Sequence, residues 1–135
     1  MIEIINQQHR YWINKFKFKS LLKKLVVYYG LKNYEISLVF VNTRTIKNLN
    51  HRFLKRNSPT DVLSFPIREK GPDGKFYLGD IIISAPTAFN QCFLKKYGME
   101  RELEYLTIHG LLHLLGFEHF GGMEEEEEKI IKLFL

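Results

Sequence analysis

Three histidines near the C-terminus constrain this chain more than any other feature. His109, His113 and His119 stand in the spacing HxxxHxxGxxH, which takes up three of the 5 histidines in the sequence. Residues four apart on a helix leave the same face, so the first two imidazoles are expected side by side. Gly116 can end that helix in a left-handed conformation and turn His119 back toward the other two rings. The spacing therefore predicts a metal site with three protein ligands.

The type of metal site follows from the number of ligands. Three imidazoles leave the fourth tetrahedral position of a zinc ion open for water, which is typical of catalytic zinc, although imidazole also binds nickel, copper and iron. Zinc peptidases with this histidine spacing carry a glutamate directly after the first histidine as general base. Here that position is Gly110. The sequence therefore predicts one Zn²⁺ per chain, without the usual peptidase base.

Length and composition favour one folded domain, residues 1–135. The share of hydrophobic residues is 45%, which is ordinary for a globular protein. The single cysteine, Cys92, permits no intramolecular disulfide and is interpreted as a core residue. No apolar run approaches the roughly 18–20 residues that span a bilayer, and the N-terminus lacks the pattern of a signal peptide. We therefore expect a cytoplasmic protein with no membrane partner.

The net charge of +5 conceals an asymmetry along the chain. Residues 1–98 contain 17 Lys and Arg against 6 Asp and Glu, a net charge of +11, whereas residues 99–135 carry −6. A basic body favours a polyanionic partner, because each phosphate that it neutralises releases counterions. Charge alone does not separate this interpretation from an ordinary solvated surface. The acidic run from Glu124 to Glu128 is interpreted as a solvated helix face.

Periodicity and capping residues predict strands that alternate with helices. The expected strands cover residues 1–6, 35–41, 61–65 and 79–83, and Pro66 is expected to stop the third. The expected helices cover residues 17–29, 43–53, 85–97, 100–115 and 123–135. The predicted fold class is α+β (mixed α/β), with a small mixed sheet of about four strands, some of them parallel, packed with about five helices.

Three segments of the sequence match one family when they are taken together. They are Leu49-Asn50 followed by PTDVLSFP at 59–66, LGDIIIS at 78–84, and HGLLHLLGFEH at 109–119. With this combination the chain resembles the bacterial YbeY family, single-domain zinc-dependent endoribonucleases of rRNA maturation and ribosome quality control. The resemblance runs from about Ile4 to Leu135. It implies a small mixed sheet flanked by helices, one zinc held by His109, His113 and His119, and RNA as the substrate.

Two positions depart from the family pattern. The arginine that the family usually carries five residues before the proline of PTDVLSFP is Leu54 here. Arg52 and Arg56 flank it, but a shift of two residues on a helix turns a side chain by about 200°. The usual aspartate before the third histidine is Glu118. The assignment of the zinc ligands is unaffected by these departures, whereas the assignment of the catalytic residues is left undecided.

The candidates for those open roles are few. Arg52, Lys55 and Arg56 are the candidates for RNA binding, and the two arginines also for stabilising the charge of the transition state. Glu118 is the third catalytic candidate. Its candidate roles are to accept a proton, to orient a zinc-bound water or, as the preferred role, to hydrogen-bond a ligand histidine.

Three hypotheses follow. The preferred one is a zinc-dependent, single-strand-specific endoribonuclease of small-subunit (16S) rRNA, in which zinc lowers the pKa of a bound water to about 7. The second is a zinc metallopeptidase, which the histidine spacing favours and Gly110 disfavours. The third is a non-catalytic RNA- or ribosome-binding module with structural zinc, which Leu54 favours. The sequence leaves the attacking nucleophile, the cleavage position and the oligomeric state open.

Overall fold

The chain alternates between strands and helices from end to end. The structure, a computed structural model, describes residues 1–31, 33–56, 58, 60–95, 97–118 and 121–135. Within those residues the elements are β1 (Ile2–Asn6), α1 (Lys15–Tyr28), β2 (Tyr34–Val41), α2 (Thr43–Leu54), β3 (Val62–Lys70), β4 (Phe76–Ser84), α3 (Ala85–Lys95), α4 (Met99–Leu114) and α5 (Met123–Phe134).

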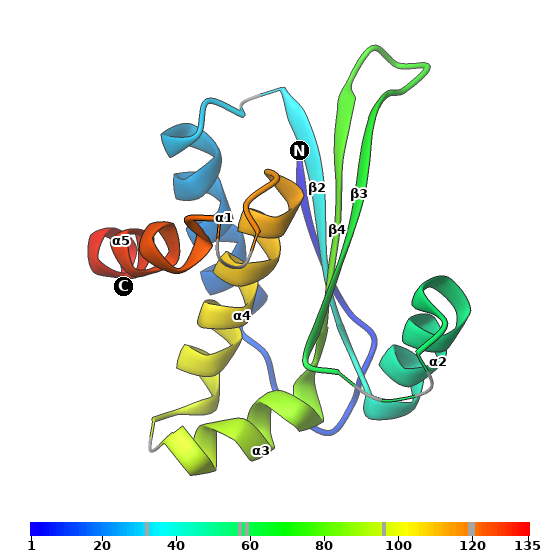
Figure 1. Ribbon diagram of the computed structural model, residues 1–135, viewed down its shortest axis with the longest axis vertical. Helices are drawn as coiled ribbons and strands as arrows, with labels where there is room; N and C mark the ends of the chain where they lie inside the picture. The colour runs from blue at the N-terminus through cyan, green and yellow to red at the C-terminus, as the bar shows by residue number, and fades with distance from the viewer. Residues whose placement is uncertain (32, 57, 59, 96, 119–120) are drawn as a thin grey trace.

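The four strands form one mixed sheet in the order β1-β2-β4-β3. β1 pairs with β2 and β2 with β4 in parallel, whereas β3 pairs with β4 in the antiparallel sense. Figure 1 shows α1, α4 and α5 on one side of the sheet and α2 on the other. The predicted α+β class is therefore confirmed, with five helices around a four-stranded sheet in the described part of the chain.

The central strand β4 has an apolar residue on both faces, because successive side chains of a strand point to opposite sides. Ile81 and Ile83 face the main core, where they are buried with Leu111 of α4. Ile82 faces the smaller core beneath α2, which it shares with Ile46. Cys92 is buried, as predicted, and its thiol donates a hydrogen bond to the carbonyl oxygen of Phe89 at 3.0 Å.

The prediction that Pro66 stops the third strand is wrong. β3 continues to Lys70, and Pro66 lies opposite Gly79 of β4 in the pairing register. β3 is an edge strand of the sheet, where a missing N–H costs no bond to a second neighbour. The register shifts between Pro66 and Glu69, and Arg68 adopts a φ of +50° there. With this irregularity in its pairing, β3 continues beyond the proline.

Smaller differences concern the ends of the helices. α1 begins at Lys15 rather than at Lys17, because the side chain of Asn14 caps it by accepting from the backbone N–H of Lys17. α3 ends at Lys95, two residues before the predicted end. No helix among the described residues combines the length and apolar character that crossing a membrane requires.

Candidate metal centre

α4 lies unusually close to the sheet at Gly110. A Cβ atom at this position would stand 2.5 Å from Cγ2 of Ile81 in β4, far inside normal contact. The hydroxyl of Ser64 in β3 donates a hydrogen bond of 3.1 Å to the carbonyl oxygen of Gly110. Glycine at position 110 therefore sets the distance between helix and sheet, and with it the place of the two histidines on either side.

The imidazoles of His109 and His113 lie side by side, as predicted. Their Nε2 atoms are 3.2 Å apart, and the ring centroids are 4.8 Å apart. Two nitrogens that bind one tetrahedral zinc at about 2.0–2.1 Å are separated by about 3.3–3.4 Å. The residues thus fit a zinc ion in the type of donor atom and in the spacing of the two nitrogens.

The turn after α4 also follows the prediction. Gly116 has a φ of +97°. Its N–H donates to the carbonyl oxygen of His113, and the N–H of Phe117 donates to that of Leu112, both at 3.0 Å. This pairing satisfies carbonyl groups that a helix end leaves open.

The third predicted ligand, His119, lies outside the described residues. Within the described ranges no group of three His, Cys, Asp or Glu side chains has the geometry of a metal site. The structure therefore brings two of the three predicted ligands together, and the role of His119 stays a prediction.

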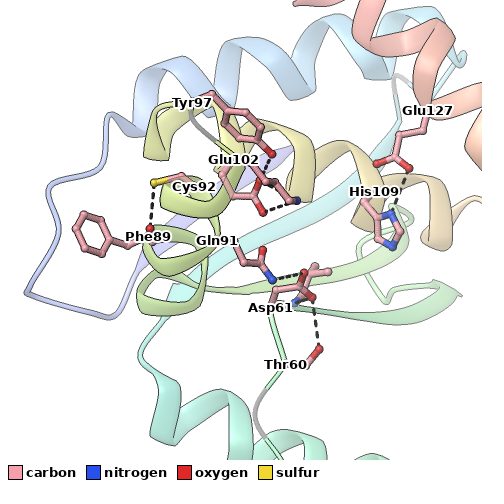
Figure 2. Close-up of polar contacts among 11 residues, drawn as sticks. Thr60, Asp61, Phe89, Gln91, Cys92, Tyr97, Glu102, His109 and Glu127 are labelled. Carbon is pink, nitrogen blue, oxygen red and sulfur yellow. Dashed lines mark hydrogen bonds and ion pairs between the residues drawn. The ribbon is translucent and has the colours of Figure 1, made fainter.

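A carboxylate from α5 approaches His109 on the other ring nitrogen. Oε2 of Glu127 lies 3.4 Å from Nδ1 of His109, as Figure 2 shows. The two side chains are 22% and 23% exposed. The hydrogen bond to Glu127 raises the pKa of His109 above its ordinary value, although burial of the ring acts in the opposite direction. The charges of Asp61 and Glu124 add to the rise.

The sequence interpretation missed this residue, because it assigned the whole acidic run to a solvated face. The helical spacing of Glu127 from two apolar residues could have indicated a position on the buried side of α5. Glu127 follows Met123 by four residues and precedes Ile130 by three, so all three lie on one side of α5. Met123 and Ile130 are fully buried. Glu127 therefore belongs to the face that packs on the protein.

Glu118, by contrast, is exposed after the turn that ends α4. Its carbonyl oxygen accepts a hydrogen bond from the N–H of Gly121 at 2.9 Å. Glu127, and not Glu118, is the carboxylate whose hydrogen bond to His109 the structure describes. A role for the side chain of Glu118 stays a prediction.

A cleft of about 470 Å³ opens beside the two histidines. It lies between the end of α2 and the histidines of α4, and the segment that leads into β3 lines it as well. The lining residues are Asn50, Leu54, Arg56, Thr60, Asp61, Val62, Leu63, Ser64, Pro66, His109 and His113. The PTDVLSFP segment and the histidine motif, which lie far apart in the sequence, thus meet in one cavity.

Arg56 is the one predicted cation that lines the cleft in the described part of the chain. Lys55 ends α2 in a left-handed conformation, with a φ of 60°. This residue redirects the backbone, so Arg56 reaches the cleft that Leu54 also lines, and the expected 200° helical offset does not apply. Arg52 lies in the last turn of α2, with its guanidinium carbon 5.6 Å from the ring centroid of Phe53.

Asp61, to which the sequence interpretation gave no role, is fixed in the wall of the cleft. Its Oδ1 accepts the N–H of Val62 at 2.8 Å, and its Oδ2 accepts the side-chain amide of Gln91 in α3 at 3.3 Å (Figure 2). These bonds tie the start of β3 to α3. They also keep a negative charge near His109.

A second polar group ties α3 to α4 (Figure 2). Glu102 of α4 is completely buried, and Nζ of Lys95 lies 3.3 Å from each of its carboxylate oxygens. The hydroxyl of Tyr97 also donates to Glu102. Burial, reinforced by this bond, raises the pKa of Tyr97. Helix α4, which carries the histidine pair, is thus tied to α3 through a buried carboxylate whose charge Lys95 neutralises.

Comparison with known proteins agrees with this geometry. The model of the family described as Endoribonuclease YbeY matches residues 3–133. The chain belongs to the YbeY family. Endoribonuclease YbeY of Moorella thermoacetica is 44% identical in an alignment of 110 positions that covers 72% of this chain and 70% of that protein. Endoribonuclease YbeY of Caldicellulosiruptor saccharolyticus is 38% identical in an alignment of 147 positions that covers 98% of this chain and 91% of that protein.

A solved structure supports the same fold. The solution structure of TM1509 from Thermotoga maritima superposes with a TM-score of 0.64 at 28% identity, over 98% of this chain and 87% of that one. YbeY is a family of nucleases, so the prediction of an enzyme of the hydrolase class is confirmed. The metallopeptidase alternative also fails on geometry, because Ile81 leaves no room at position 110 for the glutamate that it needs.

Proposed function

We propose that this member of the YbeY family is a zinc-dependent endoribonuclease that cleaves single-stranded RNA in the cleft between α2 and α4. The substrate proposed is small-subunit (16S) rRNA on its way into the ribosome, in the cytoplasm. One observation carries the proposal. Two histidine nitrogens at the spacing of zinc ligands lie in the same cleft as an arginine.

The residues that line the cleft have different roles in the proposed reaction. His109 and His113, with His119 as the predicted third ligand, would hold the zinc, which when bound supplies a water of lowered pKa and charge to stabilise a phosphoryl oxygen. Arg56 provides a positive charge for the phosphate, where negative charge grows in the transition state. Leu54 offers an apolar surface to a ribose or a base.

The size of the cleft supports a single-stranded substrate. A cavity of about 470 Å³ is of the size that takes a small molecule or a nucleotide, not a duplex. Unpaired nucleotides can be turned out of a strand and seated in such a cavity, whereas an RNA helix offers only its grooves and backbone. Cleavage of an unpaired oligoribonucleotide, and sparing of the same sequence in a duplex, is the expected result.

The deciding experiment pairs metal content with cleavage. Wild type, His113→Ala and the control His9→Ala, which changes an exposed histidine in the loop after β1, are purified, and zinc is measured by mass spectrometry. We expect one zinc per chain and cleavage of purified small-subunit rRNA for wild type and control, and loss of both for His113→Ala. Full cleavage by zinc-free His113→Ala would contradict the metal mechanism. Zinc-loaded wild type that leaves every RNA intact would contradict the nuclease.

A further inference from the structure

We propose that Glu127 is a positioning residue of the metal centre, which fixes the tautomer and the orientation of the His109 ring. This inference rests on the proposed function in one respect, since it takes His109 as a zinc ligand. It concerns α5, an element that none of the sequence motifs includes.

The argument begins with the two nitrogens of the ring. A neutral imidazole carries one N–H and one lone pair, and only the lone pair binds a metal. Nε2 of His109 is the atom next to His113, at 3.2 Å from its Nε2. For that atom to offer its lone pair, the proton must stand on Nδ1.

Glu127 favours that arrangement. Its Oε2 lies 3.4 Å from Nδ1 of His109, and an ionised carboxylate only accepts hydrogen bonds. An Nδ1–H donor is therefore stabilised, and a lone pair on Nδ1 is repelled. The same contact restrains rotation of the ring, so that Nε2 stays turned toward the second histidine. A carboxylate of this kind also makes the ligand nitrogen a stronger base.

The carboxylate is itself held in place. The buried side chains of Met123 and Ile130 anchor α5 to the core on either side of Glu127. The hydroxyl of Tyr29, next to the end of α1, donates a hydrogen bond of 2.5 Å to Oε2 of Glu126. Two kinds of contact thus fix the helix that presents Glu127, and its approach to His109 follows from the fold.

The neighbouring Glu128 provides a matched control. Its side chain is 70% exposed, and Oε1 lies 3.2 Å from Nζ of Lys132 one turn further along α5. Glu128→Gln and Glu127→Gln remove the same charge from adjacent positions of one helix. An effect that depends only on the net charge of α5 would be equal in the two variants.

The first measurement is made without metal. Nitrogen-15 NMR of the histidine rings, recorded at rising pH until the spectrum of His109 no longer changes and the ring is neutral, reports which of its nitrogens carries the proton. We expect the Nδ1–H form in wild type and in Glu128→Gln, and a shift toward the Nε2–H form in Glu127→Ala. An unchanged tautomer in Glu127→Ala would overturn the inference and leave the proposed nuclease untouched.

The second measurement is zinc affinity, from competition with a chromophoric chelator. Loss of an outer carboxylate commonly lowers metal affinity by about 10- to 100-fold. We expect a loss of that size for Glu127→Ala, a smaller one for Glu127→Gln, and wild-type affinity for Glu128→Gln. Equal affinity in all four proteins would contradict the positioning role. The expected tautomer together with no zinc binding in wild type would instead count against the proposed function.

Discussion

The guanidinium of Arg68 donates a hydrogen bond of 2.8 Å to the carbonyl oxygen of Leu114, the last residue of α4. Arg68 stands at the irregular point of the edge strand, where its φ is +50°. The bond satisfies a carbonyl that the helix end leaves open, and it places a positive charge at the negative end of the helix dipole. The edge strand therefore supports the helix that carries His109 and His113.

Removal of that bond is expected to destabilise the fold modestly. Arg68→Ala should lower the free energy of unfolding by about 1–2 kcal/mol, because a carbonyl loses a charged donor. Arg68→Gly should cost less, since glycine adopts a positive φ without strain. Urea unfolding of the two variants tests this, with Lys70→Ala at an exposed position of the same strand as control. Equal stability of the alanine variant and wild type would show that the bond contributes nothing.

The two arginines near the end of α2 are expected to differ in catalysis. Arg56→Ala should lower kcat by about 10²- to 10³-fold, the usual effect of removing one group that stabilises transition-state charge. Arg52→Ala should remain within a few-fold of wild type, because Arg52 lies against Phe53 and not in the cleft lining. Single-turnover cleavage of an unpaired oligoribonucleotide measures both. A reversed order would move the phosphate contact to Arg52.

Leu54 permits a test by gain of function. Its side chain lines the cleft and is 47% exposed, so an arginine there needs no repacking of the core. In the Arg56→Ala background, Leu54→Arg should recover part of the lost cleavage. Recovery by Leu54→Lys as well would indicate that charge alone matters, since lysine lacks the planar fork of arginine. No recovery in either would argue against a phosphate at this wall.

Gly110 is expected to tolerate no side chain. Gly110→Ala places a Cβ 2.5 Å from Ile81, so α4 must move off the sheet. Overpacking of this kind costs about 1–3 kcal/mol, and the shift should weaken zinc binding as well. Gly121→Ala is the control, because its added atom would meet only Glu118, in ordinary contact, with the carbonyl oxygen nearest at 3.4 Å. Thermal unfolding and chelator competition would detect the two effects, and a wild-type result in both would refute the close packing.

Asp80 makes stability depend on pH. Burial in β4 raises the pKa of its carboxyl, with help from the charge of Glu3, while a hydrogen bond to Ser37 opposes the rise. A raised acid pKa in the folded state favours folding at low pH, and this contribution is lost as the pH rises through the folded value. Asp80→Asn should therefore be more stable than wild type at pH 7. The difference should vanish below about pH 4, the ordinary aspartate pKa. Urea unfolding of both zinc-free proteins checks it, and a gap that is constant with pH would be inconsistent with this cause.

The sequence predicted well those features that local rules decide. The histidine pair and the Gly116 turn depend on helix geometry and on the conformational freedom of one glycine, so both were foreseen. The strand that passes Pro66 was not, because its tolerance of proline depends on the place of β3 at the edge of the sheet. Glu127 was missed for a similar reason. It is 18 residues from His109 in the chain, and only the packing of α5 on α4 brings the two together.

The two helices that line the cleft, α4 and α2, differ in how much of each is buried. α4 buries residues along its whole length, whereas α2 buries only Ile46 and Asn50, and Phe53 and Leu54 near its end are 57% and 47% exposed. Helices with few buried contacts open locally at a lower free energy than those in the core. Amide hydrogens of α2 should therefore exchange with solvent sooner than those of α4. We therefore expect the α4 side of the cleft to keep its geometry and the α2 side, which bears Arg56, to be the part that adjusts to a bound molecule.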